Sequence, residues 1–210
     1  MRAEEVMKLS PIVPVIALED EVDALPLANA LLEGGINVME ITLRTPAGLK
    51  AIEIIAKSLP QMHVGAGTVL NGDDFNNAVA HGAAFVFSPG ISEELMQTSK
   101  QTCVALIPGV ATASEVMLAK NNGFEHCKLF PATVAGGIAM LKALSGPFPT
   151  MRFCPTGGVN LENISDFLSL DNVLCAGGSW IVPKALIDKK DFTQITALCI
   201  EAIDKIKGNN

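Results

Sequence analysis

The sequence has no tyrosine, one tryptophan, three histidines and only three arginines among its 210 residues. Without a tyrosine, no phenol is available as a general acid, and the scarcity of aromatic rings leaves little surface for stacking nucleic-acid bases. The net charge is −7, and nucleic-acid affinity comes largely from neutralised phosphates. We therefore expect no nucleic-acid partner, although a small anionic ligand is compatible with this charge.

Long apolar runs and metal-binding patterns are also missing. No apolar run reaches the roughly 18 residues that a membrane span needs, and the N-terminal stretch Met1–Ser10 has no apolar signal region. The five cysteines form no C-x-x-C pair and show no zinc spacing with the histidines. Gly65–Thr68 lacks the third glycine of a dinucleotide fingerprint. We expect a cytoplasmic protein without membrane attachment, metal or cofactor.

Short β-branched apolar runs alternate with longer amphipathic segments from one end of the chain to the other, without a linker. Their spacing of roughly 20 to 25 residues leaves room for one helix between successive strands. This pattern predicts an α/β fold, a single (β/α)8 TIM barrel over residues 1–210 with an N-terminal helix at 1–9; a doubly wound sheet is the alternative. The eight predicted strands are Ile12–Ala17, Asn37–Leu43, His63–Ala66, Ala84–Phe87, Val104–Ile107, His126–Phe130, Met151–Cys154 and Asn172–Ala176.

Charged residues inside the predicted strands are few and need explanation. Side chains alternate along a strand, so Glu40, Thr42 and Arg44 share one face. The opposite face carries the apolar Met39, Ile41 and Leu43, which can pack on the helices. The charged face therefore points into the barrel interior. Glu40 and Arg44 lie about 13 Å apart along the strand, too far for a simple direct pair. Each is therefore free to engage another group.

Lys128 interrupts an apolar strand, whereas the other eleven lysines fall in helical or terminal segments. Desolvation of a buried lysine favours the neutral amine, which is the nucleophile for Schiff-base formation with a carbonyl substrate. A structural salt bridge with Glu40 is the alternative reading. Arg152, at the start of its strand, is better explained as a structural charge.

Glycine pairs follow the last two predicted strands, at Gly157-Gly158 and Gly177-Gly178. Glycine lets the backbone approach a phosphate closely, and the loops after strands 7 and 8 are the recurrent phosphate site of barrel enzymes. Two pairs in these positions predict a phosphate-binding site, although a single pair would indicate only a tight turn.

Several strings of residues, in order from about Pro11 to Pro183, resemble the 2-keto-3-deoxy-6-phosphogluconate (KDPG) and 4-hydroxy-2-oxoglutarate (KHG) aldolase family. No motif position departs from the family pattern. The strings are Val38–Thr45, Val64–Leu70, Phe87–Gly90, Leu106–Gly109, Lys128–Ala132, Arg152–Gly158 and Gly177–Trp180.

The resemblance implies a metal-independent barrel enzyme, usually a homotrimer. It would cleave its sugar-acid phosphate reversibly to pyruvate and glyceraldehyde 3-phosphate in the Entner–Doudoroff route. Lys128 would be the Schiff-base lysine and Glu40 the acid/base. The remaining roles implied are carboxylate binding by Arg44, Thr68 and Thr156, phosphate binding by Gly157, Gly158, Gly178 and Ser179, and pocket lining by Pro89 and Phe130.

Three other functions stay open at this point. A related aldolase would prefer the galactonate epimer or the unphosphorylated hydroxy-oxoglutarate. A phosphosugar epimerase or isomerase would use Glu40 as a base and form no covalent adduct. A non-catalytic barrel that serves as a phospho-ligand sensor or an assembly subunit is disfavoured, because interior Glu, Arg and Lys together are costly in a mere scaffold.

Overall fold

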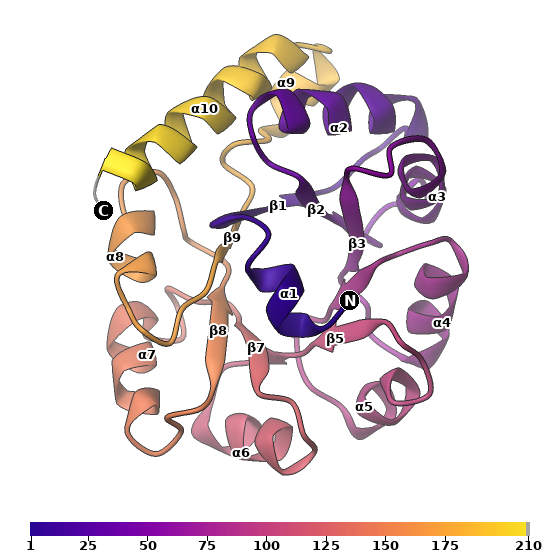
Figure 1. The fold of residues 1–210 in the computed structure, drawn as a ribbon. Helices are drawn as coiled ribbons and strands as arrows, with labels where there is room; N and C mark the ends of the chain where they lie inside the picture. The colour runs from indigo at the N-terminus through magenta and orange to yellow at the C-terminus, as the bar shows by residue number, and fades with distance from the viewer. Residues whose placement is uncertain (209–210) are drawn as a thin grey trace.

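The structure, a computed structural model, describes residues 1–208. Parallel strands lie at the centre and helices surround them, with α1 in front of the strands in this view (Figure 1). The strands are β1 (Ile12–Ile16), β2 (Val38–Thr42), β3 (His63–Gly67), β4 (Phe85–Phe87), β5 (Ala105–Ile107), β6 (Gly109–Val110), β7 (His126–Leu129), β8 (Arg152–Pro155) and β9 (Ala176–Gly178).

The helices occupy the segments between the strands. Asn71, Ser92 and Thr112 cap their helices by accepting a backbone N–H with the side-chain oxygen. The helices are α1 (Ala3–Met7), the 3-10 turn η1 (Glu21–Asp23), α2 (Ala24–Glu33), α3 (Gly48–Ser58), α4 (Gly72–Ala80), α5 (Glu93–Ser99), α6 (Ala113–Asn121), α7 (Gly137–Ser145), α8 (Ile164–Leu168), α9 (Lys184–Asp188) and α10 (Phe192–Gly208).

The strands form a curled parallel sheet in two parts. One part has the order β5-β4-β3-β2-β1-β9 and the other has the order β6-β7-β8. The first strand pairs with the last, with Ile12 opposite Ala176. The segments that contain β8 and β9 are joined by two isolated bridges, Phe153↔Val173 and Thr156↔Gly177, instead of a continuous ladder. The ladder is therefore interrupted, and the structure does not show the continuous eight-stranded barrel that the spacing predicts.

Six of the eight predicted strands agree with the observed ones within one residue at each end, and two differ more substantially. The predicted Val104–Ile107 corresponds to β5, and a further short strand, β6, follows after Pro108, whose nitrogen cannot donate to a ladder. The predicted Asn172–Ala176 begins four residues too early, because β9 starts at Ala176 and includes Gly177 and Gly178. The sequence places these two glycines in a loop after the strand, since glycine is uncommon in strand interiors.

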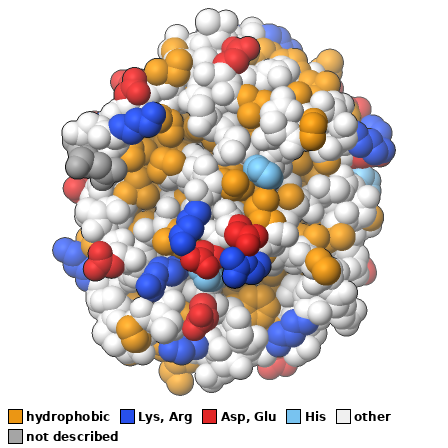
Figure 2. All heavy atoms as spheres, viewed as in Figure 1, with side chains coloured by type: hydrophobic (Ala, Val, Ile, Leu, Met, Phe, Trp, Pro, Cys, Tyr) orange, Lys and Arg blue, Asp and Glu red, His pale blue; other side chains and the backbone are white. Residues whose placement is uncertain are grey.

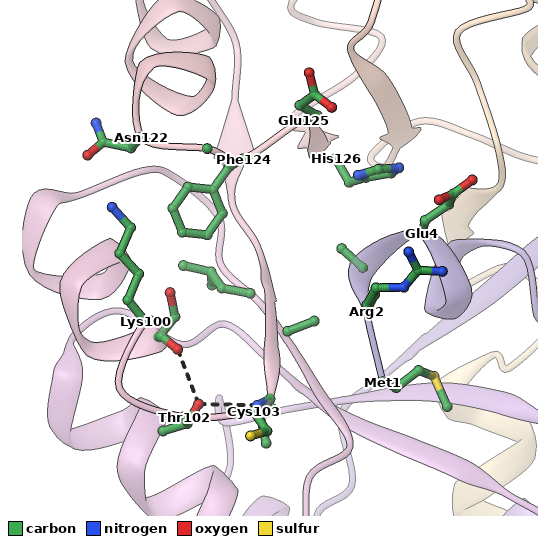
Figure 3. Close-up of a pocket in the computed structure, with 16 residues that line it drawn as sticks. Met1, Arg2, Glu4, Lys100, Thr102, Cys103, Asn122, Phe124, Glu125 and His126 are labelled. Atoms are coloured by element: carbon green, nitrogen blue, oxygen red, sulfur yellow. Dashed lines mark hydrogen bonds between the residues drawn. The ribbon is translucent and has the colours of Figure 1, made fainter.

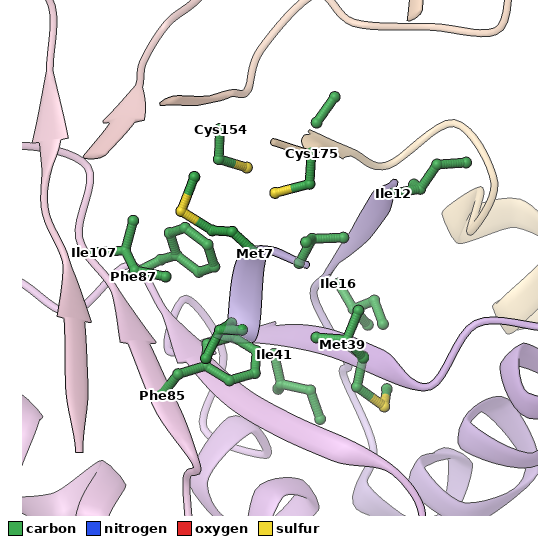
Figure 4. Packing of buried hydrophobic residues seen from close by; sticks show 14 of the residues in the cluster. Met7, Ile12, Ile16, Met39, Ile41, Phe85, Phe87, Ile107, Cys154 and Cys175 are labelled. Carbon is green, nitrogen blue, oxygen red and sulfur yellow. The ribbon is translucent and has the colours of Figure 1, made fainter. Parts of the chain in front are cut away.

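Buried apolar side chains from the strands and the inner helix faces form one cluster (Figure 4). Met7 of α1 belongs to it and is fully buried. On the outer side of α1, charged residues gather at the middle of this face of the molecule (Figure 2), where Arg2 pairs with Glu5 and Lys8 with Glu4. Helix α1 thus lies across the amino-terminal ends of the strands with its apolar side inward.

Among residues 1–208, no helix combines the length and the apolar character needed to cross a membrane.

Candidate active site

Lys128 and Glu40 meet in the space enclosed by the curled sheet. They lie on β7 and β2, which are not neighbouring strands. Lys128 Nζ is 3.1 Å from Glu40 Oε1 and 3.3 Å from Oε2, and the residues are 5% and 1% exposed. Buried charges persist when they are paired, and the same contact puts a carboxylate within proton-transfer distance of an amine. The salt-bridge and nucleophile interpretations of Lys128 are thus compatible.

Glu40 occupies space that a side chain on Gly67 would fill. A Cβ atom at Gly67 would lie 2.0 Å from Glu40 Oε1 and 2.6 Å from its Cγ and Cδ. Gly67 lies on the adjacent strand β3, where it is the register partner of Thr42 on β2. The missing side chain therefore allows the carboxylate to reach Lys128.

Two aromatic rings flank the Lys128 ammonium group. Nζ lies 5.2 Å from the ring centroid of Phe87 and 5.4 Å from that of Phe130. Phe87 is on β4 and is 1% exposed, whereas Phe130 follows β7 directly and is half-buried. The nitrogen is thus surrounded by a carboxylate and two π faces, each of which favours a positive charge.

Arg44 is held at the carboxyl end of β2 through Thr42. The strand ends at Thr42, so Arg44 lies in the following turn and is exposed. Its Nε donates to Thr42 Oγ1 at 3.1 Å, and Thr42 Oγ1 donates to the carbonyl of Ile16 at 2.9 Å. Thr42 therefore links an exposed cation to the buried strand that carries Glu40.

Thr68 and Pro89 follow β3 and β4 at the same end of the sheet. Thr68 has φ +59°, a left-handed conformation that is unusual for a β-branched residue and is found mainly where function requires it. The backbone of Pro89 packs so closely on Gly109 that a Cβ there would lie 2.4 Å away. Gly109 is the register partner of Lys128, so Pro89 lies beside the lysine's neighbouring strand.

The turn after β8 contains two glycines in the left-handed conformation. Gly157 and Gly158 have φ +98° and +81°. The N–H of Thr133 donates to the carbonyl of Gly157 at 3.1 Å, and a Cβ on Gly158 would lie 2.0 Å from Thr133 Oγ1. These two glycines therefore lie against the loop that follows the lysine strand.

The end of β9 adjoins the same turn. Thr156, 6% exposed, forms an isolated bridge with Gly177, and a Cβ on Gly177 would lie 2.3 Å from Thr156 Oγ1. Gly178 lies under the ring of Trp180, while Ser179 is exposed at the strand end. The glycines of β9 thus allow close packing of Thr156 and Trp180, which the sequence did not indicate.

Buried cysteines lie on the lysine strand and on the strand beside it. Cys154 is the register partner of Lys128, and its sulfur points toward that of Cys175 (Figure 4). The hydrogen bond between these two buried thiols lowers the pKa of Cys154 and raises that of Cys175. Burial raises the pKa of Cys127 to about 12, so this thiol stays protonated as a core residue.

A cavity of about 540 Å³ lies at the opposite end of the strands (Figure 3). It is bordered by the start of α1, by Ala105 of β5 and by His126 of β7, and contains neither Lys128 nor Glu40. Barrel enzymes react at the carboxyl ends of their strands, so this cavity is separate from the candidate active site. Within residues 1–208, no three His, Cys, Asp or Glu side chains gather as metal ligands.

Sequence reasoning assigned no role to Thr42, Gly67, Phe87 or Thr133. Thr42 shares a face with Glu40 and Arg44, and that periodicity was a usable signal. The others gave none, because a phenylalanine in an apolar strand resembles any core residue and a close approach to glycine depends on a neighbouring strand.

The fold and the buried amine–carboxylate pair are those of an enzyme that acts on a carbonyl compound. The family described as KDPG and KHG aldolase matches residues 3–198. The chain is 48% identical over 204 residues to the 2-dehydro-3-deoxy-phosphogluconate aldolase of Pseudomonas aeruginosa, covering 97% of this chain and 93% of that protein. The chain belongs to the KDPG and KHG aldolase family, and its curated relatives are aldolases, which are lyases.

Two solved structures match nearly the whole chain. The KDPG aldolase from Legionella pneumophila, with pyruvate captured at low pH as a covalent carbinolamine intermediate, has a TM-score of 0.95 and 47% identity over 97% of this chain and 98% of its own. The aldolase of Zymomonas mobilis ZM4, with 3-phosphoglycerate, has a TM-score of 0.91 and 44% identity over 96% and 94%.

Proposed function

We propose that the protein is a Schiff-base aldolase that cleaves KDPG reversibly to pyruvate and glyceraldehyde 3-phosphate. KHG, which would give pyruvate and glyoxylate, is a second substrate that the family membership supports. The observation that carries the proposal is the buried contact of 3.1 Å between Lys128 Nζ and Glu40 Oε1. This contact supports a nucleophile and a proton carrier that act together on a keto acid.

The reaction begins when Glu40 takes a proton from Lys128. The neutral amine adds to the C2 carbonyl, and the resulting carbinolamine loses water with a proton from Glu40, leaving a cationic imine. Glu40 then removes the C4 hydroxyl proton, and the C3–C4 electron pair moves into the imine as the bond breaks. The aldehyde leaves, C3 of the enamine takes a proton, and water releases pyruvate and the free lysine. General acid–base help of this kind contributes roughly 10²- to 10⁴-fold.

The remaining residues bind the two ends of the substrate. Arg44, Thr68 and Thr156 hold the carboxylate and its neighbouring oxygens. Two observations support this assignment: the Arg44 guanidinium is held by Thr42, and Thr68 has a left-handed backbone. Gly157, Gly158, Gly178 and Ser179 hold the phosphate. The left-handed conformation of Gly157 and Gly158 supports this role, because glycine lets the backbone N–H groups approach an anion closely. Pro89 and Phe130 line the pocket between these ends.

We further infer an eight-stranded barrel, in which β5 and β6 are halves of one strand around Pro108 and the two isolated bridges join β8 to β9. A homotrimer and a cytoplasmic location are inferred from the family resemblance. Light scattering after gel filtration tests the trimer, which a monomeric mass would overturn.

The decisive experiment is borohydride reduction in the presence of pyruvate. We expect a stable pyruvyl adduct on the peptide that contains Lys128 and no adduct in Lys128→Ala, which also loses turnover. Lys100→Ala, at an exposed lysine, is the matched control and keeps both. An unmodified wild-type protein would contradict the proposal and favour an epimerase or isomerase. Steady-state kinetics on KDPG, its galactonate epimer and KHG then establish the preferred substrate.

A further inference from the structure

Phe87 is held in a fixed orientation beside the reacting nitrogen. Its ring lies edge-to-face with that of Phe85, with centroids 5.7 Å apart and an interplanar angle of 86°. Phe85 is fully buried, and its ring occupies the space over Gly65, where a Cβ would lie 2.2 Å from it. Phe85 thus supports Phe87, whose ring centroid is 5.2 Å from Lys128 Nζ.

Volume alone does not explain a phenylalanine at this position. Strand β4 ends at Phe87 among aliphatic residues such as Val86 and Ile107, and leucine or isoleucine would also bury apolar surface. A ring adds a negative π face, which attracts a cation most strongly where water is excluded. Lys128 is only 5% exposed, so the attraction is only weakly screened by solvent.

Glu40 cannot be a constant counter-ion for this nitrogen. In the proposed reaction it takes up and gives back a proton at successive steps, so its charge alternates while a cationic imine forms and is consumed. An aromatic face has no proton to exchange, and its interaction with the cation persists throughout. The two rings therefore complement a carboxylate whose charge is engaged in catalysis.

We propose that Phe87 is a positioning residue that acts through Lys128, stabilising the cationic imine with its ring face and raising the fraction of enzyme held as the covalent pyruvate intermediate. This inference rests on the proposed Schiff-base function. Phe87 would thus bring strand β4 into the reaction, since no other side chain of β4 has an assigned role in the chemistry.

Fluorinated phenylalanines test the inference with little change in shape. Successive fluorines weaken the π face, so we introduce phenylalanine with one, three and five ring fluorines at position 87, and the same series at Phe75, a fully buried ring of α4. The readout is the pyruvate concentration that gives half-maximal borohydride trapping, measured by intact mass. At position 87 we expect a progressive rise, roughly 2- to 30-fold for the full series, and at position 75 less than a twofold change.

The outcomes separate this inference from the proposed function. If the wild-type protein forms no adduct, the Schiff-base function itself fails. If it forms the adduct but the series at position 87 is flat, or if both positions respond equally, the role of Phe87 is overturned and the function stands. Phe87→Leu adds a second check, because it should raise the half-maximal pyruvate concentration even if a heavily fluorinated variant folds poorly.

Discussion

The position of Glu40 depends on the side chain that Gly67 lacks. The carboxylate fills the volume beside Gly67 Cα, where an added Cβ would lie 2.0 Å from Oε1. Backbone on a paired strand has little freedom to retreat, so any side chain at position 67 would displace the carboxylate. The distance from Glu40 to Lys128 is therefore determined partly by a residue on a third strand.

We accordingly expect Gly67→Ala to resemble Glu40→Gln. Both should still form the pyruvate adduct, more slowly, while KDPG cleavage falls roughly 10²- to 10⁴-fold because proton transfer is impaired. Gly146→Ala is the control, since Gly146 has φ −61° and its Cβ would approach no atom closer than 3.9 Å. Comparison of adduct formation with single-turnover cleavage checks the effect. Full cleavage by Gly67→Ala would remove the proposed link.

At this scale the sequence predicted the charged residues better than the uncharged ones. Lys128 and Glu40 were identifiable because charges are rare inside apolar strands, and the structure brings them together. Gly67 and Phe87 were not identifiable, since their importance comes from contacts between strands that are distant in the chain. Periodicity describes one element at a time and carries no such information.

Among the elements, the prediction of strand ends was least accurate where proline or glycine lies within a strand. Pro108 separates β5 from β6, and Gly177 and Gly178 extend β9 beyond the apolar run that predicted it. The helical patterns of the sequence run over more residues and predict helices at 21–33, 46–58, 73–81, 93–100, 113–121 and 137–144. The observed helices agree with these bounds within two residues, except that η1 forms the start of the first. Local composition therefore identified the order of elements but not the places where the ladder is interrupted.

The turn between β8 and α8 gives a prediction about phosphate. Gly158→Ala should raise KM for KDPG about tenfold or more, because alanine is strained at φ +81° and its Cβ would strike Thr133. The unphosphorylated KHG should be little affected. Gly123→Ala carries the same kind of backbone strain at φ +87° with no atom within 4 Å, and we expect neither KM to change. An equal rise for both substrates in Gly158→Ala would indicate general distortion instead of a phosphate site.

For the whole molecule, buried thiols predict weakening at alkaline pH. Burial raises the pKa of Cys127 from 9.0 to about 12, and that of Cys199 likewise to about 12. The folded state therefore retains protons that the unfolded state loses. The stabilisation is complete below about pH 9 and is lost as the pH rises toward 12.

Urea unfolding at pH 8 and pH 10.5 measures this effect. Between these values the wild-type protein should lose roughly 2 kcal/mol more unfolding free energy than Cys127→Ala, which lacks the thiol. Cys103→Ala, at an exposed cysteine, should follow the wild type. Identical pH dependence in Cys127→Ala and wild type would contradict the prediction.

The pairing of β1 with β9 has a consequence for synthesis of the chain. Residues 12–14 find their partners at 176–178, and Glu40 and Lys128 are 88 residues apart. A growing polypeptide on the ribosome therefore cannot complete the pairing of its first strand until nearly the entire chain has emerged. We expect aldol cleavage to recover during refolding only after the two ends of the molecule have joined.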